Sequence, residues 1–243
     1  MTSQNIISDF ALASKRDEIV AHCKEVLDTK GLAKVFVVNA HILCEGLRDE
    51  NYRHIIASAS LNICDGVNVR RLVKWTSGVR VELYPGPDFF SDILIEEKLG
   101  TLRHFFLGGS EEVSGALQGR FQGENFKFHC PPFKESADLF DYDEIVNDIQ
   151  GFSPDFIWVG LGAPKQEKVI HKLAEFLDSG ILVGVGAAFN FHSGIPQMAR
   201  APKFIRTWHL EWLFRLCQEP RRIGKRQLRN LWYLQKVFFK YRR

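Results

Sequence analysis

The chain has 243 residues, of which 45% are hydrophobic and 25% are charged. This composition predicts one large or two small globular domains, and it excludes disordered, collagen-like and disulfide-scaffold proteins. The formal net charge of +3 combines a body at −8 with residues 200–243, where 13 Lys+Arg and 2 Asp+Glu give +11. Such a basic segment predicts an anionic partner: phosphate groups, nucleic acid or a membrane face.

Short apolar runs alternate with amphipathic stretches along most of the chain. The runs predict strands that are buried on both faces, at residues 34–38, 60–64, 102–107, 125–129, 155–160 and 181–185. The stretches predict helices at residues 15–30, 50–58, 67–76, 88–99, 111–121, 143–150 and 164–177, with Ser91, Ser110 and Asp141 as candidate helix starts. We therefore expect an α/β fold with a mostly parallel, Rossmann-like sheet flanked by helices.

Residues 199–243 change character and predict a basic helical C-terminal appendage to an α/β body of residues 1–198. Helices are expected at residues 202–218 and 221–241, separated by Glu219-Pro220 because proline breaks a helix. Basic amphipathic helices are typical of proteins that lie on a membrane surface. Docking of the tail on the body as its sole role is an equally good interpretation.

Ligands of open parallel sheets bind beyond the carboxyl ends of the strands, where this chain carries several glycine turns. Glycine lets the backbone approach a ligand closely, and a following helix N-terminus attracts phosphate. The turns at Gly108-Gly109-Ser110 and Gly162-Ala163-Pro164 fit this pattern, with Pro164 placed as a first helical residue. Neither matches the GxGxxG or Walker A motif, and each taken singly is more often an ordinary connection of an α/β fold.

Asp65 is the sharpest single candidate, because it follows an apolar strand and precedes Gly66. A carboxylate there could be a general base if partial burial raises its pKa, whereas on the pattern alone capping of the helix that starts at Val67 is the favoured interpretation. Lys165-Gln166-Glu167 lies in a predicted first helical turn. These side chains could contact a sugar or a diphosphate, or form a solvated turn in which Glu167 complements the helix dipole.

The spacing of possible metal ligands predicts no metal site and no bound cofactor. Asp141-Tyr142-Asp143 has the DxD spacing of many sugar-nucleotide transferases, but it precedes a helix, so capping is the better interpretation. The histidines show no HxxxH spacing and the five cysteines form no CxxC pair, which predicts reduced thiols and a cytoplasmic location. No apolar run approaches the about 20 residues that span a bilayer, and no secretory signal is recognisable.

Several long blocks together resemble the bacterial WecG/TagA/CpsF glycosyltransferase family. They are residues 156–167, residues 184–191 followed by Arg200-Ala201-Pro202, and residues 211–222, with Asn39-Ala40-His41 and Asp65-Gly66-Val67 matching the N-terminal blocks. The resemblance covers nearly the whole chain from about Lys34. It implies a metal-free, inverting transfer of a sugar from a UDP-sugar to a saccharide on a polyprenyl diphosphate, in cell-surface polysaccharide synthesis. An N-acetylmannosamine-type donor, or its uronic acid, is favoured.

The resemblance also implies roles for individual residues. Asp65 is expected to be the catalytic base and Gln166 to contact substrate. The other residues expected to bind substrate are Asn39, Gly66, Gly108, Gly109, Gly162, Pro164, Lys165, Glu167, Gly186 and Asn190. The cations expected to bind the lipid diphosphate are Arg200, Arg215, Arg221, Arg222, Lys225 and Arg226. A peripheral position at the inner face of the cell membrane follows, and a homo-oligomer is compatible with the family.

Two departures from the family pattern keep alternatives open. Val37-Val38-Asn39 stands where members usually have Thr-Pro-Asn, and Gly86-Pro87-Asp88 where they often have Gly-Thr-Asp. The lost polar groups leave open an exopolysaccharide glucosyl or glucuronosyl transfer by the same family. A rival of another class is a nucleic-acid-binding protein that uses the basic tail, although the body carries no nucleic-acid motif. A Rossmann-type oxidoreductase lacks its glycine fingerprint.

Overall fold

The computed structural model describes residues 12–96, 99–208 and 211–218, and Pro220, Gly224, Asn230 and Tyr233. Its centre is a six-stranded sheet with the order β2-β1-β6-β5-β3-β4, in which every pair of neighbours is parallel. The predicted α/β fold with a parallel sheet is therefore confirmed. The strands are β1 (Leu32–Val38), β2 (Leu61–Cys64), β3 (His104–Gly108), β4 (Phe126–His129), β5 (Phe156–Gly160) and β6 (Gly180–Gly184).

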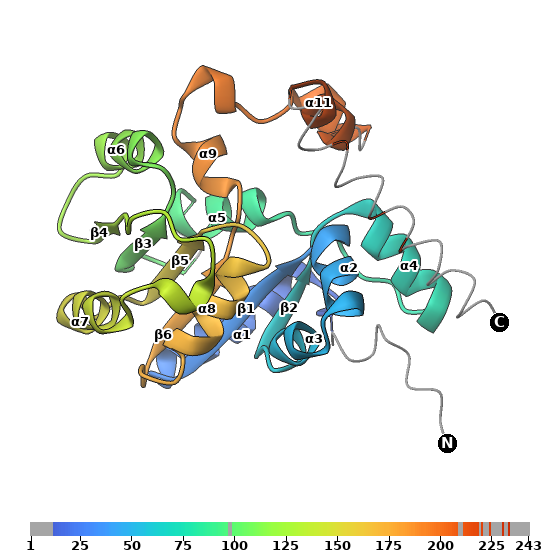
Figure 1. Cartoon of the computed structure of the whole chain (residues 1–243). Coiled ribbons are helices and arrows are strands. Elements are labelled where there is room, and N and C mark those ends of the chain that lie inside the picture. Colours follow the sequence, from blue (N-terminus) through green and yellow to red (C-terminus); the bar gives the residue numbers. More distant parts are fainter. Residues whose placement is uncertain are drawn as a thin grey trace.

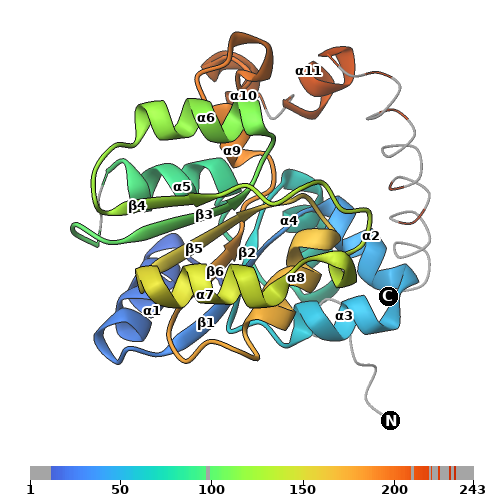
Figure 2. The same cartoon turned by 60° about the vertical axis from the view of Figure 1, so that its left-hand side comes forward.

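Helices cover both faces of the sheet (Figures 1 and 2). One face carries α2 (Ala40–Arg48), α3 (Glu50–Ala57), α4 (Val67–Ser77), α7 (Tyr142–Phe152) and α8 (Lys165–Leu173). The other face carries α1 (Arg16–Asp28), α5 (Gly86–Leu94), α6 (Glu111–Arg120) and α9 (Ala188–His192). The short helices η2 (Ala137–Leu139), η3 (Pro196–Met198), α10 (Lys203–Thr207) and α11 (Glu211–Gln218) complete the described elements.

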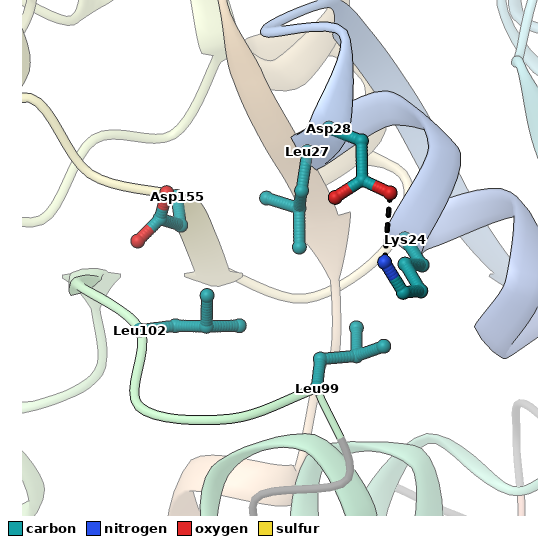
Figure 3. A pocket seen from close by; sticks show the side chains of 6 residues that line it. All are labelled: Lys24, Leu27, Asp28, Leu99, Leu102 and Asp155. Carbon is teal, nitrogen blue, oxygen red and sulfur yellow. Dashed lines mark hydrogen bonds and ion pairs between the residues drawn. The ribbon is translucent and has the colours of Figure 1, made fainter.

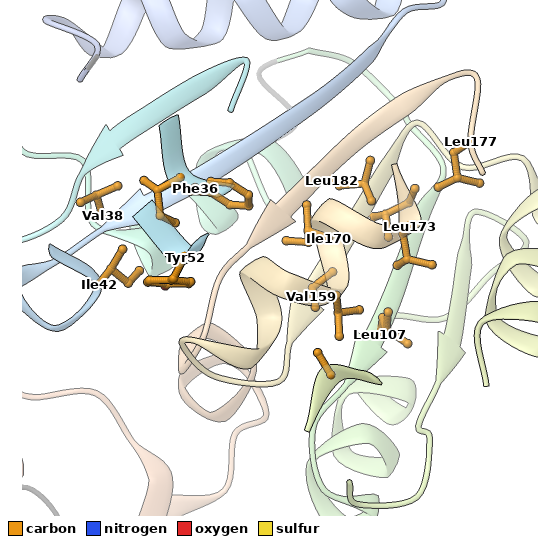
Figure 4. Packing of buried hydrophobic residues seen from close by; sticks show 14 of the residues in the cluster. Phe36, Val38, Ile42, Tyr52, Leu107, Val159, Ile170, Leu173, Leu177 and Leu182 are labelled. Carbon is orange, nitrogen blue, oxygen red and sulfur yellow. The ribbon is translucent and has the colours of Figure 1, made fainter. Parts of the chain in front are cut away.

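The strands are apolar nearly throughout because alternate side chains enter two separate cores. In β1, Phe36 and Val38 belong to the core under α3 and α8, whereas Val35 and Val37 belong to the core under α1 and α5. Figure 4 shows the first of these cores. Burying both faces of a strand disfavours polar side chains, with Asn62 in β2 and His104 in β3 as buried exceptions, which is why most of these runs were recognisable.

The helix predictions were correct for most elements and wrong at identifiable points. The helices α2 and α9 were not predicted, since α2 begins directly in the Asn39 turn and α9 has only five residues. Ser91 does not start a helix; it lies inside α5, which begins at Gly86 after Pro85. The single helix predicted for residues 202–218 is divided into α10 and α11.

Two predicted helix starts are confirmed by their capping hydrogen bonds. Ser110 Oγ accepts from the Val113 N–H at 3.2 Å, and Asp141 Oδ1 accepts from the Glu144 N–H at 3.1 Å. The interpretation of the DxD spacing as a helix cap therefore holds for Asp141. Among the helices that the structure describes, none combines the length and apolarity needed to cross a bilayer. The helix predicted for residues 221–241 lies outside the described residues, apart from isolated positions, and the domain boundary at residue 198 stays a prediction.

Candidate active site

The carboxyl edge of the sheet brings together the turns that the sequence singled out. Because all strands run in the same direction, the residues that follow them lie along one edge. Strand order places Asp65 after the outer strand β2 and Asn39 after its neighbour β1. The glycine turns that end β6, β5 and β3 follow in that order, so one continuous edge carries all five segments.

Asp65 is half-buried at the junction of β2 and α4. Its N–H donates to the carbonyl of Val38 at 2.9 Å, which ties it to the end of β1. Gly66, with φ 113°, is the N-cap of α4 and has no side chain to cap that helix. The interpretation of Asp65 as the N-cap is therefore wrong. Burial, followed by the negative charge of Asp65, raises the pKa of the Cys64 thiol to about 12, so this neighbour stays protonated.

Asn39 is the N-cap of α2, a role that uses one of its two polar atoms. Its Oδ1 accepts from the N–H groups of His41 and Ile42 at 2.9 and 3.1 Å. Only the side-chain NH₂ group then remains to donate to a ligand. Since Asn39 follows β1 and Asp65 follows β2, the two residues lie at neighbouring strand ends.

The Gly108-Gly109 turn after β3 packs closely against the turn after β5. Gly108 and Gly109 have φ values of 100° and 87°, a region that favours glycine. A Cβ on Gly108 would also lie 2.7 Å from Leu161 Cδ2. Beyond Ser110, the first turn of α6 holds the exposed acidic residues Glu111 and Glu112, so it lacks the cationic surroundings that favour phosphate.

The turn after β5 is held by aromatic packing and by a glycine conformation. The ring of Phe189, from α9, covers Gly160 so closely that a Cβ there would lie 2.3 Å from Phe189 Cδ2. Gly162 has φ 76°, and the Ala163–Pro164 peptide bond is cis. Pro164 is the N-cap of α8 and not its first helical residue, which corrects the prediction by one position.

Lys165 is occupied by the segment between β4 and α7. Its Nζ donates to the carbonyl of Lys134 at 2.6 Å and lies 4.5 Å from the ring centroid of Phe133. Burial lowers the pKa of Lys165. A diphosphate would have to compete with the Lys134 carbonyl for this ammonium group. The Phe133 ring itself is 84% exposed.

Gln166 and Glu167 are both buried, with exposures of 3% and 0%. Gln166 Oε1 accepts from the N–H groups of Gly162 and Gly186 at 3.2 and 3.0 Å. Gln166 Nε2 donates to Glu167 Oε1 at 2.7 Å, and the Tyr52 hydroxyl donates to Glu167 Oε2 at 2.9 Å. The interpretation of Glu167 as a residue of a solvated helical turn is therefore wrong.

Burial also determines the protonation states of Glu167 and Tyr52. It raises the pKa of Glu167 to about 7, against the hydrogen bonds from Gln166 and Tyr52, which lower it. Burial and the charge of Glu167 raise the pKa of Tyr52 well above its ordinary value of 10, so the phenol keeps its proton and donates.

The turn after β6 leads directly into α9. Gly186 has φ 53°, and its N–H is used by Gln166. Asn190 lies within α9, is half-buried, and accepts a hydrogen bond from Ser193 Oγ through its backbone carbonyl at 2.7 Å. Its side chain is thus not engaged by that bond.

Arg200 binds two carboxylates in this structure. Its guanidinium pairs with Asp88 in the first turn of α5, and its Nε lies 3.3 Å from Glu211 Oε1 at the start of α11. Arg200, which the sequence predicts to bind the lipid diphosphate, therefore joins α5 to α11. The side chain of Arg215 lies outside the described residues, as do Arg221, Arg222, Lys225 and Arg226.

The opposite edge of the sheet carries a shallow pocket between α1 and the segment before β3. Leu27, Leu99 and Leu102 form its apolar part, and Lys24 and Asp28 pair at its rim (Figure 3). It lies at the amino ends of the strands, away from the glycine turns. In the part of the chain that the structure describes, no three His, Cys, Asp or Glu side chains gather as metal ligands would.

Sequence reasoning missed three features of this edge: Tyr52 as the partner of Glu167, the packing of Phe189 on Gly160, and the carboxylates around Arg200. Tyr52 and Glu167 are 115 positions apart, so no local spacing signals their contact. The only hint was a tyrosine among the polar residues of a predicted helix.

Comparison with known proteins matches residues 7–243 to the model of the glycosyl transferase WecG/TagA/CpsF family. Three relatives are named N-acetylglucosaminyldiphosphoundecaprenol N-acetyl-β-D-mannosaminyltransferases. The protein of Bacillus spizizenii is 28% identical over 86% of this chain and 80% of its own length. The Bacillus subtilis protein is 26% identical over 81% and 76%. A Staphylococcus aureus protein is 28% identical over 86% and 82%.

Proposed function

The chain belongs to the WecG/TagA/CpsF family and is a glycosyltransferase, and from this we propose that it transfers a sugar from a UDP-sugar to a polyprenyl-diphosphate-linked saccharide. The reaction inverts the anomeric centre and contributes to a cell-surface polysaccharide. The relatives are named as N-acetylmannosaminyltransferases, so we propose a donor that carries an N-acetylmannosaminyl group for this chain.

The observation that carries the proposal is a half-buried carboxylate, Asp65, on the same sheet edge as three glycine turns. In the proposed step, Asp65 takes the proton of an acceptor hydroxyl. The hydroxyl oxygen bonds to the anomeric carbon from the face opposite UDP, and the bond from that carbon to UDP breaks with its electron pair. The Asn39 side-chain NH₂ group, at the neighbouring strand end, is proposed to orient the acceptor or the donor sugar.

Donor binding is assigned to the glycine turns beyond β3, β5 and β6. Gly108, Gly109 and Gly162 have backbone conformations that let a ligand approach the main chain closely. Gly66, Pro164, Gly186 and Asn190 lie on the same edge and complete the proposed substrate surface. The N–H groups of Gly162 and Gly186 are used by Gln166, so other backbone N–H groups of these turns would stabilise the charge that develops on the leaving phosphate.

The lipid diphosphate is assigned to the basic appendage. Arg215, Arg221, Arg222, Lys225 and Arg226 are the proposed cations, and Arg200 would join them after releasing Asp88 or Glu211. The acceptor is anchored in a membrane, so we place the enzyme as a peripheral protein at the inner face of the cell membrane. The +11 charge of residues 200–243 supports that position, since anionic lipids attract basic helices.

A second donor class is supported by one contact. Val37 Cγ1 lies 3.3 Å from the position a Cβ would take on Gly86, the residue before Pro87, so one departure from the family pattern lies against the segment that carries the other. Val37 is 5% exposed and lies in β1, the strand that Asn39 follows. An apolar contact where relatives carry polar groups favours a donor with different substituents, such as glucose or glucuronic acid in an exopolysaccharide.

The proposal is tested with a panel of UDP-sugars and short-chain polyprenyl-diphosphate saccharides, measured by UDP release and by mass of the product. We expect turnover with one donor class and no loss of turnover in EDTA. Turnover with UDP-glucose or UDP-glucuronate alone selects the second donor class. If no donor gives a product, the proposed reaction is contradicted. If EDTA abolishes activity, the metal-free mechanism is contradicted. A gel shift with DNA and RNA tests the nucleic-acid alternative.

A further inference from the structure

Gln166 and Glu167 connect parts of the sheet edge that are far apart in the sequence. We infer that Gln166 is a positioning residue: together with Glu167 and Tyr52 it fixes the spacing of the turns after β5 and β6. The inference rests on the proposed function in one respect, namely that the donor binds at these turns. It differs from the direct substrate contact that the family resemblance implies for Gln166 and Glu167.

The side-chain carbonyl of Gln166 binds two turns at once. Its Oε1 accepts from Gly162 after β5 and from Gly186 after β6, at 3.2 and 3.0 Å. Both lone pairs of that oxygen are then used, so the atom has no remaining capacity to bind substrate. The distance between the two turns is thereby set by one atom.

The lack of a side chain on Gly184 shows independently where the amide lies. A Cβ on Gly184 would be 3.0 Å from Gln166 Nε2, so the amide lies directly against the end of β6. β6 is the strand between β1 and β5. The amide therefore sits at the centre of the edge, with the turn of β5 on one side.

Glu167 determines which way the amide faces. If the amide were flipped, its NH₂ group would meet the two glycine N–H groups, and the pairing would be lost. Glu167 Oε1 accepts from Gln166 Nε2 at 2.7 Å and so holds the productive orientation. The Tyr52 hydroxyl fixes the other carboxylate oxygen at 2.9 Å, which anchors the unit to α3.

All members of this unit are buried. Tyr52 and Glu167 are fully covered, and Gln166 is 3% exposed. A buried polar network of this kind is costly when one partner is lost, because water cannot replace it. Glu45 and Asp49 are the other charged groups close to the Tyr52 hydroxyl, and both are acidic, so they reinforce its role as a donor.

Gln166→Glu tests the inference by placing two carboxylates face to face. We expect kcat/KM for the UDP-sugar to fall about 10–100-fold at pH 8, whereas KM for the lipid acceptor changes less than about threefold. Near pH 6 a proton shared between the carboxylates should restore part of the loss. Glu144→Gln, an exposed residue in the first turn of α7, is the control for a Glu-to-Gln exchange.

The double variant Gln166→Glu with Glu167→Gln exchanges the two groups and restores every hydrogen bond. The new carboxylate accepts from Gly162 and Gly186 and from the new amide, whose oxygen accepts from Tyr52. We expect donor kcat/KM to return to within about threefold of wild type, since the turns regain their spacing. A folded double variant without recovery overturns the inference in favour of direct substrate contact by Gln166. An unaltered single variant overturns it as well.

Amide hydrogen exchange separates this inference from the proposed function. The N–H groups of Gly162 and Gly186 should be protected in wild type and in the double variant, and should exchange at least about tenfold faster in Gln166→Glu. Inactive wild type with this exchange pattern contradicts only the proposed function. Active wild type with equal exchange in all variants contradicts only the inference. If Gln166→Glu fails to fold, the double variant against wild type still decides, and Tyr52→Phe gives a milder perturbation of the same unit.

Discussion

Two carboxylates on the carboxyl edge of the sheet lie in opposite environments. Asp65, after β2, is half-buried and follows the last residue of an edge strand. Glu167, in α8, has no exposed surface, and both of its oxygens accept hydrogen bonds from protein groups. A carboxylate without exposed surface can organise the backbone but cannot meet a substrate. The contrast therefore supports the proposal that the chemistry belongs to the β2 side and the positioning to the β5 and β6 side.

The largest expected effect belongs to Asp65. Asp65→Asn keeps the size of the side chain but removes the base, so kcat should fall about 10²–10⁴-fold. The melting temperature should stay close to that of wild type, because asparagine keeps the size and polarity of the side chain and Gly66 is the N-cap of α4. Turnover is measured with the active UDP-sugar and compared with Glu144→Gln. Near-wild-type turnover in a folded variant would assign the base to another group.

The position of Asp65 at the carboxyl edge of the sheet could be predicted from the sequence alone. Doubly buried strands and a parallel sheet predict that Asp65 and the glycine turns share one edge, because topology alone determines it. Burial of Glu167 could not be predicted, since it depends on Tyr52, a residue of another helix that local spacing does not connect to it. The same holds for Arg200, whose carboxylate partner Asp88 is 112 positions away.

The pH dependence of stability sharpens the contrast between the two carboxylates. Burial raises the pKa of Glu167 to about 7 from an ordinary value of 4.5. Between these values the folded state binds more protons than the unfolded state, so this group's contribution to stability falls as pH rises through that window. From pH 5 to pH 8 we expect wild type to lose on the order of 2–3 kcal/mol of unfolding free energy relative to Glu167→Gln.

Denaturant unfolding at pH 5, 6, 7 and 8 measures this difference. The comparison with Glu167→Gln removes the contributions of other titrating groups, such as Asp148, whose pKa is lowered by its hydrogen bond with His129. If the two proteins lose stability in parallel across this range, Glu167 is either hydrated or ionised without cost. Either result would contradict the raised pKa of Glu167.

The smallest expected effect concerns the backbone at the end of β5, on the positioning side of the sheet edge. Gly160→Ala would place a Cβ 2.3 Å from the Phe189 ring, and the ring lies in the core, so it cannot move without disturbing α9. We expect a loss of about 1–3 kcal/mol, or roughly 2–12 °C in melting temperature. The matched control is Gly115→Ala, at an exposed position inside α6 where a Cβ would meet nothing within 4 Å. That change should stabilise the protein by about 0.5–1 kcal/mol, because alanine loses less backbone entropy in a helix. Equal melting temperatures for the two variants would mean that the turn after β5 accommodates a Cβ at residue 160 without cost. The close packing of Phe189 on Gly160 would then not hold this turn in place.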